Sequence, residues 1–137
     1  MPAESSVSGK LIVVIDDDPA MLELYSLVIQ KEGFRVETAA DGDEGLGKIK
    51  RLKPDLVVLD LMMPRYDGFH VLKDMQNGEL SSIPVVVVTG RYTGADADRM
   101  LRKESRVVEV LLKPVKTPIL ISVLRRELKM GPTKNLA

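Results

Sequence analysis

The sequence predicts an α/β fold in which a parallel sheet is covered by helices on both faces. Five short apolar runs recur at fairly even spacing, and the segments between them have the length and the apolar periodicity of helices. The run Val85–Val88 contains no polar residue, which is typical of a strand that is buried on both faces. Right-handed crossovers between consecutive strands then give a layered α/β sandwich.

The five predicted strands are the apolar runs themselves. In chain order they are Leu11 to Ile15, Val36 to Ala40, Leu56 to Leu59, Val85 to Val88, and Val107 to Leu112. A first helix is predicted to follow directly, because Asp18 suits a helix cap and Pro19 suits the first helical position.

Each helix is predicted from apolar residues that recur at helical spacing on one face. The expected inward-facing residues are, in successive helices, Met21, Leu24, Tyr25 and Val28; Leu46 and Ile49; Phe69, Leu72 and Met75; Met100, weakly, within 93–104; and Ile121, Leu124 and Leu128. The last helix is expected to begin at Thr117-Pro118 and to stop at Gly131-Pro132. Residues 10–130 are therefore expected to form one domain, with flexible tails at 1–9 and 131–137.

The composition excludes several classes of site. The 137 residues include no cysteine and one histidine, so thiolate chemistry and disulfides are excluded, and a metal site must use oxygen ligands, as Mg2+ or Ca2+ does. The net charge is zero, which argues against a general nucleic-acid partner. No apolar run is long enough to span a membrane, and residues 1–10 lack an apolar targeting segment. A cytoplasmic protein is expected.

Chemically reactive side chains follow four of the predicted strands. Asp16-Asp17-Asp18 follows the first strand and Asp60 the third, while Thr89 ends the fourth and Lys113 follows the fifth. Ligands of open parallel sheets bind beyond the carboxyl ends of the strands, where these side chains are expected to meet. Carboxylates suit Mg2+, and a metal, an ammonium and a hydroxyl suit the charge of a transferring phosphoryl group. A carboxylate nucleophile would form an acyl phosphate.

At these residues the chain resembles the receiver domains of response regulators, the phosphoacceptor proteins of two-component phosphorelays. The matching segments are Val14–Pro19, Asp60–Phe69, Val88–Gly90 and Lys113-Pro114, and the resemblance covers about residues 10 to 130. It implies a flavodoxin-like, doubly wound (βα)5 fold whose five parallel strands have the order 2-1-3-4-5, an arrangement for which a receiver protein is a standard example. It also implies that the Lys113-Pro114 peptide bond is cis.

The resemblance also implies a role for each site residue. Asp60 would be the phosphoacceptor, and Thr89 and Lys113 would contact the phosphoryl group. Mg2+ would be held by Asp16, Asp17, Asp60 and the backbone carbonyl of Met62. Such a protein is a signalling switch and not an enzyme acting on other molecules, because it catalyses only its own phosphorylation and dephosphorylation.

The partners implied are proteins. A sensor histidine kinase or a phosphotransfer protein would supply the phosphoryl group, and a downstream protein would bind the face of the fourth helix, fifth strand and fifth helix. A homodimer fits the same resemblance, whereas direct binding to nucleic acid or membrane is not expected.

Two departures from the family pattern support an alternative. Val110 stands where the family usually has an aromatic residue, and Glu104–Val107 lacks the common Gly-Ala pair. The alternative is a constitutive protein-binding module that keeps the site but does not switch.

Two other motifs point to different chemistry. Gly42–Lys48 satisfies the G-x-x-x-x-G-K pattern of phosphate-binding loops, but Ile49 replaces the hydroxyl residue that would hold Mg2+. We interpret this segment as an Asp-Gly turn into an amphipathic helix. Asp16 and Asp18 also form the D-x-D of haloacid-dehalogenase-like phosphatases, although Pro19 stands where that family has glycine.

For three further residues, the sequence predicts a location but no direct part in phosphoryl transfer. His70 is expected on the surface of the third helix. Met62 and Arg91 lie two residues beyond Asp60 and Thr89, and are expected to flank the mouth of the site. There they would control the access of water and therefore the lifetime of the phosphoryl group.

Overall fold

The computed structural model describes residues 9–76, 78–90, 99, 101 and 103–128. Its elements are β1 (Leu11–Ile15), α1 (Pro19–Lys31), β2 (Arg35–Ala39), α2 (Gly42–Leu52), β3 (Leu56–Asp60), α3 (Gly68–Asp74), the 3-10 helix η1 (Gly78–Ser82), β4 (Val85–Thr89), β5 (Val107–Leu112) and α5 (Thr117–Glu127). The fourth helix predicted within 93–104, including Met100, lies largely outside the described residues.

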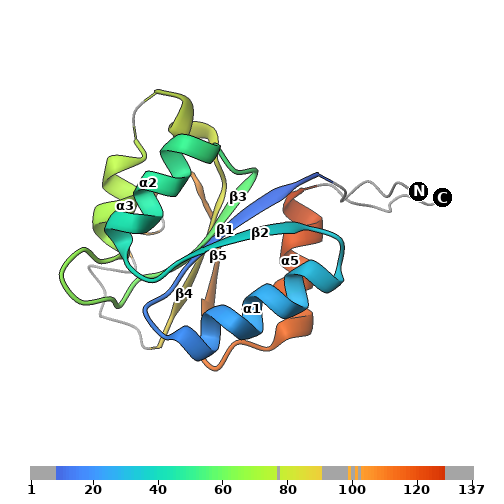
Figure 1. The fold of residues 1–137 in the computed structure, drawn as a ribbon. Coiled ribbons are helices and arrows are strands. Elements are labelled where there is room, and N and C mark those ends of the chain that lie inside the picture. Colours follow the sequence, from blue (N-terminus) through green and yellow to red (C-terminus); the bar gives the residue numbers. More distant parts are fainter. Residues whose placement is uncertain (1–8, 77, 91–98, 100, 102, 129–137) are drawn as a thin grey trace.

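The five strands form one parallel sheet in the order β2-β1-β3-β4-β5, which confirms the predicted order. Figure 1 shows α1 and α5 together on one side of the sheet and α2 and α3 on the other. All residues of β1, β3 and β4 are buried, as expected for strands with helices over both faces. The edge strand β2 alternates between exposed and more buried residues, because successive side chains point to opposite faces of the sheet and only one neighbouring strand shields it.

The core consists of two layers separated by the sheet. Alternate residues of each strand point to opposite faces, so Val13 packs beneath α2 and α3, while Val14 packs beneath α1 and α5. The predicted inward residues Leu46, Ile49, Leu72 and Met75 are buried in the first layer. Tyr25 and Leu124 are buried in the second layer, where Met21, Val28, Ile121 and Leu128 pack partly buried.

One inward prediction is wrong. Leu24 is 40% exposed, whereas Ile29 is fully buried at 0%. Helical positions differ by about 100° per residue, and the face that packs on the sheet is centred on Tyr25 and Ile29. Leu24 therefore lies beside this face of α1 and is partly open to solvent. The second strand is also displaced by one residue from its predicted bounds, and runs from Arg35 to Ala39.

Aspartates cap three helices. The side chains of Asp18, Asp41 and Asp67 accept hydrogen bonds from the first-turn amides of α1, α2 and α3, which satisfies donors that the helix itself leaves unpaired. The cap at Asp18 confirms the predicted start of α1. The cap at Asp41 confirms that Gly42 opens an amphipathic helix. In the part of the chain that the structure describes, we find no helix of the length and hydropathy needed to cross a bilayer.

Candidate functional site

The predicted site residues converge at the carboxyl edge of the sheet. Because β1, β3, β4 and β5 lie side by side and all run in the same direction, Asp16, Asp60, Thr89 and Lys113 reach the same edge. The backbone connects them further, since the amide of Lys113 donates to the carbonyl of Thr89 at 2.9 Å. The structure thus brings together residues that are up to 97 positions apart in the chain.

Three carboxylates form the acidic part of the site. One oxygen from each of Asp16, Asp17 and Asp60 lies within 4.8 Å of the others. Asp16 and Asp60 are 1% and 2% exposed, whereas Asp17 is open to solvent. Carboxylate oxygens at this spacing are the ligand type that a hard divalent cation such as Mg2+ requires.

Asp60 is held from two directions. Its Oδ1 accepts a hydrogen bond from the backbone amide of Met62 at 3.0 Å, and its Oδ2 lies 3.3 Å from Nζ of Lys113. Burial raises the pKa of Asp60 to about 6, and the charge of Asp16 adds to the rise, while the Met62 amide and the Lys113 ammonium oppose it. Asp60 is therefore ionised at neutral pH, but in an environment that favours neutralisation of its charge.

Lys113 bridges the two buried carboxylates. Its Nζ lies 3.1 Å from Oδ2 of Asp16 and 3.3 Å from Oδ2 of Asp60. Burial by itself would lower the pKa of Lys113, but the two carboxylates outweigh that effect and raise it. Lys113 is therefore a permanent cation within the site. The peptide bond that follows it, Lys113-Pro114, is cis, as the resemblance implied.

The residues present fit a divalent cation. Three carboxylates face one ammonium, so the fully ionised cluster has an excess of negative charge. Oδ2 of Asp16 is buried and forms an ion pair with Lys113. Among the described residues, no donor forms a well-aligned hydrogen bond to this oxygen. A buried carboxylate oxygen with this surplus of charge is stabilised when a cation binds.

Other predicted residues lie around this cluster. Thr89 is 2% exposed at the end of β4. The side chain of Met62 is 49% exposed and its backbone amide donates to Asp60, so it lies at the surface next to the site, whereas Arg91 is outside the described residues. His70 is exposed on α3, with Nδ1 3.0 Å from Oδ1 of Asp67 and its ring against Tyr66, as expected for a surface histidine.

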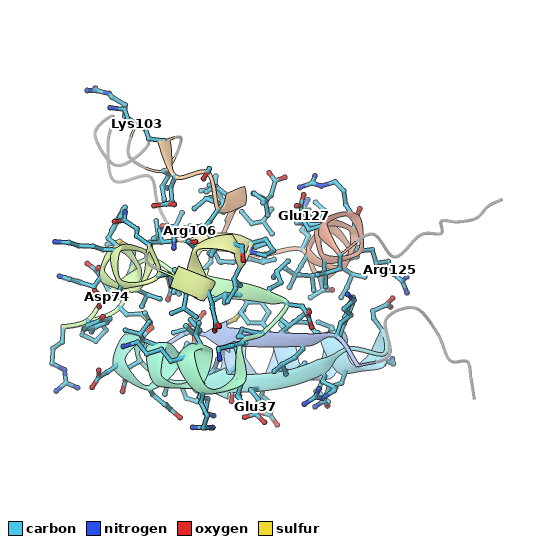
Figure 2. All side chains as sticks on the ribbon, turned by 90° about the horizontal axis from the view of Figure 1, so that it is seen from above. Glu37, Asp74, Lys103, Arg106, Arg125 and Glu127 are labelled. Atoms are coloured by element: carbon cyan, nitrogen blue, oxygen red, sulfur yellow. The ribbon has the colours of Figure 1, made fainter. Side chains whose placement is uncertain are left out.

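A second group of charged residues lies near the opposite edge of the sheet, and sequence reasoning missed it. Arg106 is 6% exposed and lies beside α3 (Figure 2). Its Nη2 donates to the carbonyl of Leu72 at 2.8 Å, and its Nε donates to Oε1 of Glu104 at 2.8 Å. The missing Gly-Ala pair was the available signal, because Arg106 belongs to the segment where the family usually has those small residues.

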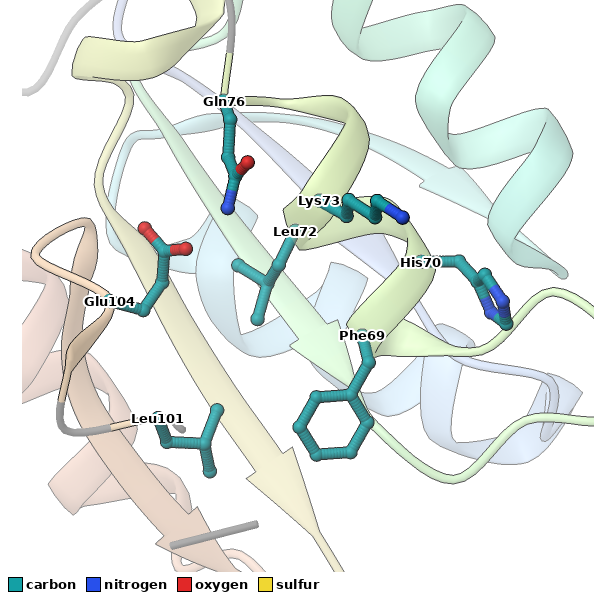
Figure 3. Close-up of a pocket in the computed structure, with 7 residues that line it drawn as sticks. All are labelled: Phe69, His70, Leu72, Lys73, Gln76, Leu101 and Glu104. Carbon is teal, nitrogen blue, oxygen red and sulfur yellow. The ribbon is translucent and has the colours of Figure 1, made fainter. Parts of the chain in front are cut away.

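Glu104 also lines a cleft of about 450 Å3 between α3 and the segment that leads to β5. Phe69, Leu72 and Leu101 form its apolar wall, and Figure 3 shows Gln76 and Glu104 facing each other across it. The hydrogen bond from Arg106 is the main cause of a lowered pKa at Glu104. This second cluster therefore pairs its charges, and its carboxylate is already stabilised without a metal.

The fold and site together define a doubly wound α/β protein with an acidic, cation-binding type of cluster at the carboxyl edge of its sheet. Residues 12–125 match the sequence model of the response regulator receiver domain. The chain belongs to this family. Membership of the receiver family argues against two other interpretations of the sequence: a phosphate-binding loop at Gly42–Lys48, and a dehalogenase-like phosphatase site at Asp16 and Asp18.

Individual relatives agree with this assignment. The chain is 36% identical over 128 residues to a transcriptional regulatory protein of Haemophilus influenzae, described as a CpxR homolog, with 92% of this chain and 54% of the relative covered. It is 34% identical over 118 residues to the DNA-binding response regulator MtrA of Mycolicibacterium smegmatis, covering 86% and 50%. The chain thus spans about half the length of these curated relatives.

Two solved structures of related proteins have a similar fold. A CheY-like receiver domain protein of Methanospirillum hungatei superimposes with a TM-score of 0.79 at 27% identity, covering 88% of this chain and 94% of that chain. A chemotaxis protein of Vibrio cholerae superimposes with a TM-score of 0.78 at 26% identity, covering 85% and 97%.

Proposed function

We propose that this protein is a phosphorylation-controlled signalling switch that accepts a phosphoryl group on Asp60, in a Mg2+-dependent reaction, from a histidine kinase or a phosphotransfer protein. One observation carries the proposal. The carboxylates of Asp16, Asp17 and Asp60 lie within 4.8 Å of one another at the sheet edge, and Lys113 reaches two of them. Membership of the receiver family supports it.

In the proposed reaction the carboxylate of Asp60 is the nucleophile. The Asp60 carboxylate attacks the phosphorus of a phosphohistidine, the phosphorus–nitrogen bond breaks as the phosphorus–oxygen bond forms, and the electron pair remains on the histidine nitrogen. The pKa of about 6 leaves most of the Asp60 carboxylate ionised at neutral pH. The transfer modifies the protein itself, so the chain does not act as an enzyme on other substrates.

The surrounding residues have supporting roles in this proposal. Asp16, Asp17, Asp60 and the Met62 carbonyl would hold Mg2+, which when bound neutralises charge on the phosphoryl oxygens. The ammonium of Lys113 is already 3.3 Å from Oδ2 of Asp60, so it pairs with the added charge. Thr89 would donate its hydroxyl to a phosphoryl oxygen.

Output would pass through proteins that bind the face formed by the fourth helix, β5 and α5. On the described part of this face, Leu112 and Ile119 are each 49% exposed and line a groove together with Val115 and Lys116. Exposed apolar side chains rimmed by a charge suit a protein partner or a second copy of the chain. The new charge on Asp60 would shift the population between two conformations of this face.

A small-molecule phosphoryl donor with Mg2+ tests the proposal directly. The intact mass of the wild-type protein should increase by one phosphoryl group, and the Asp60→Asn variant should show no increase. A known receiver domain treated in parallel is the control for the donor. If that control gains the group and the wild-type protein does not, the proposal is wrong.

The alternative is a constitutive binding module, and Val110 is the observation that favours it. Val110 is partly buried against the core beneath α3, so the usual rotating aromatic side chain is absent at this position. Comparing amide hydrogen exchange with and without phosphoryl donor separates the two functions. Increased or decreased exchange in β5 and α5 indicates a switch, whereas exchange that is unchanged on a fully phosphorylated sample indicates the constitutive module.

A further inference from the structure

The first residue of α2 lies against the loop that follows Asp60. A Cβ atom built on Gly42 would come 2.3 Å from the backbone oxygen of Tyr66 and 2.4 Å from its Cδ1. Contacts of this kind are far inside van der Waals distance, so a side chain at position 42 would require either α2 or the loop to move. The backbone oxygen cannot rotate away as the end of a side chain can.

Helix α2 has little freedom to move. The side chain of Asp41 accepts from the amide of Glu44 at 2.7 Å, and the carboxylate of Glu44 accepts from the amide of Ala40 at 2.9 Å. Leu46 and Ile49 are buried against the sheet. A Cβ on Gly45 would already lie 2.4 Å from Cδ1 of Ile15, so α2 is packed as closely on β1 as this glycine allows.

A side chain at position 42 would therefore displace the loop between β3 and α3. The end of this loop, at Gly68, lies against the backbone of Asp60. Gly68, two residues after Tyr66, donates its amide to the carbonyl of Leu61 at 3.1 Å. A Cβ there would meet the backbone oxygen of Asp60 at 2.7 Å. Met62, whose amide donates to Asp60 at 3.0 Å, lies inside the same loop. A displacement at Tyr66 thus reaches both Met62 and Asp60.

We infer that Gly42 is a positioning residue for metal binding: by leaving room for both the backbone and the ring of Tyr66, it lets α2 hold the 61–67 loop, and hence Met62 and Asp60, in the geometry that accepts Mg2+. This inference rests on the proposed function. It predicts that the amino end of α2, which contributes no ligand of its own, controls the affinity of the site for the cation.

Gly47 provides a matched control in the same helix. A Cβ on Gly47 would have no neighbouring atom within 4 Å, so Gly47→Ala adds the same methyl group on the solvent side. Calorimetric titration with MgCl2 should show a dissociation constant at least tenfold higher for Gly42→Ala than for wild type, and within twofold of wild type for Gly47→Ala. Urea unfolding in EDTA reports separately whether each variant is folded.

Tyr66→Ala is the second variant, because it removes the ring that fills the space beside Gly42 without adding a clash. We expect it to raise the Mg2+ dissociation constant two- to fivefold. Equal affinities in Gly42→Ala and Gly47→Ala would overturn the inference, and if Gly42→Ala does not fold, wild-type affinity in Tyr66→Ala would do so. A wild-type protein that neither binds Mg2+ nor gains a phosphoryl group instead contradicts the proposed function.

Discussion

Buried charges occur at both edges of the sheet, and the two clusters are built differently. At the carboxyl edge, the buried Asp16 and Asp60 share the ammonium of Lys113, and the exposed Asp17 adds a third carboxylate beside them. Near the amino edge, Glu104 is paired with Arg106. Burial raises the pKa of Asp60, whereas the hydrogen bond from Arg106 lowers that of Glu104. The first cluster has unpaired negative charge available for a ligand, and the second has its carboxylate already paired.

This difference separates a cluster whose charge favours the binding of a cation from one whose charges are already paired with each other. A buried guanidinium with a carboxylate partner and a backbone contact is already compensated, and removing either charged partner leaves the other charge uncompensated. A surplus of carboxylates instead costs stability until a cation or a proton neutralises it.

Arg106→Met should destabilise the protein by about 3 kcal/mol, because it leaves Glu104 without its cation and the Leu72 carbonyl without its donor. Urea unfolding at neutral pH measures the change. The double variant Glu104→Met/Arg106→Met should be more stable than the single variant, since neither charge remains. A single variant as stable as wild type would show that this pair does not stabilise the fold.

The pH dependence of the metal-free protein should reveal Asp60. Its pKa rises from 3.8 to about 6 on folding, so the folded protein binds this proton more tightly than the unfolded chain. Asp60 thus contributes stability that is complete below pH 3.8 and is lost as the pH rises through about 6. We expect the free energy of unfolding in EDTA to fall by on the order of 1–3 kcal/mol over this window relative to Asp60→Asn. Parallel pH profiles for the two proteins would contradict this.

Mg2+ should stabilise the first cluster alone. At a free Mg2+ concentration ten times the dissociation constant, binding to the folded state should raise the free energy of unfolding by about 1.4 kcal/mol. The gain should be much smaller in Asp17→Asn, which removes an exposed ligand with little effect on the core. Arg106→Met, although less stable, should keep the full Mg2+ response, and a loss of that response would mean that the two clusters are coupled.

The smallest change in pH dependence is expected from Glu104→Gln, which keeps a side-chain oxygen for Arg106 but removes the group that titrates. Because the pKa of Glu104 is lowered from 4.5 on folding, this residue contributes stability above its unfolded pKa, and the contribution is lost as the pH falls through the folded value. The direction is opposite to that of Asp60. In acid titrations followed by circular dichroism, the variant should lose less stability on acidification than wild type does.

The amino-acid sequence alone was enough to predict the sheet and to place four candidate site residues at its carboxyl edge. Uninterrupted apolar runs such as Val85–Val88 are a local property of the chain, and parallel strands bring their carboxyl ends to one edge. Once five parallel strands were recognised, Asp16, Asp60, Thr89 and Lys113 were expected at the same edge of the sheet. The observed convergence at that edge agrees with this expectation, and the strand order implied by the family resemblance is confirmed.

How closely residues distant in the chain approach one another depends on the packed fold and could not be predicted from local patterns. The rotation of α1 that exposes Leu24, the contact of Gly42 with Tyr66, and the burial of Arg106 beside Leu72 all depend on how helices settle on the sheet. The raised pKa of Asp60 has the same origin, because desolvation depends on the surrounding packed atoms and not on sequence neighbours. Local patterns specify which residues meet, whereas close packing specifies the distances and the dielectric surroundings that give them their chemistry.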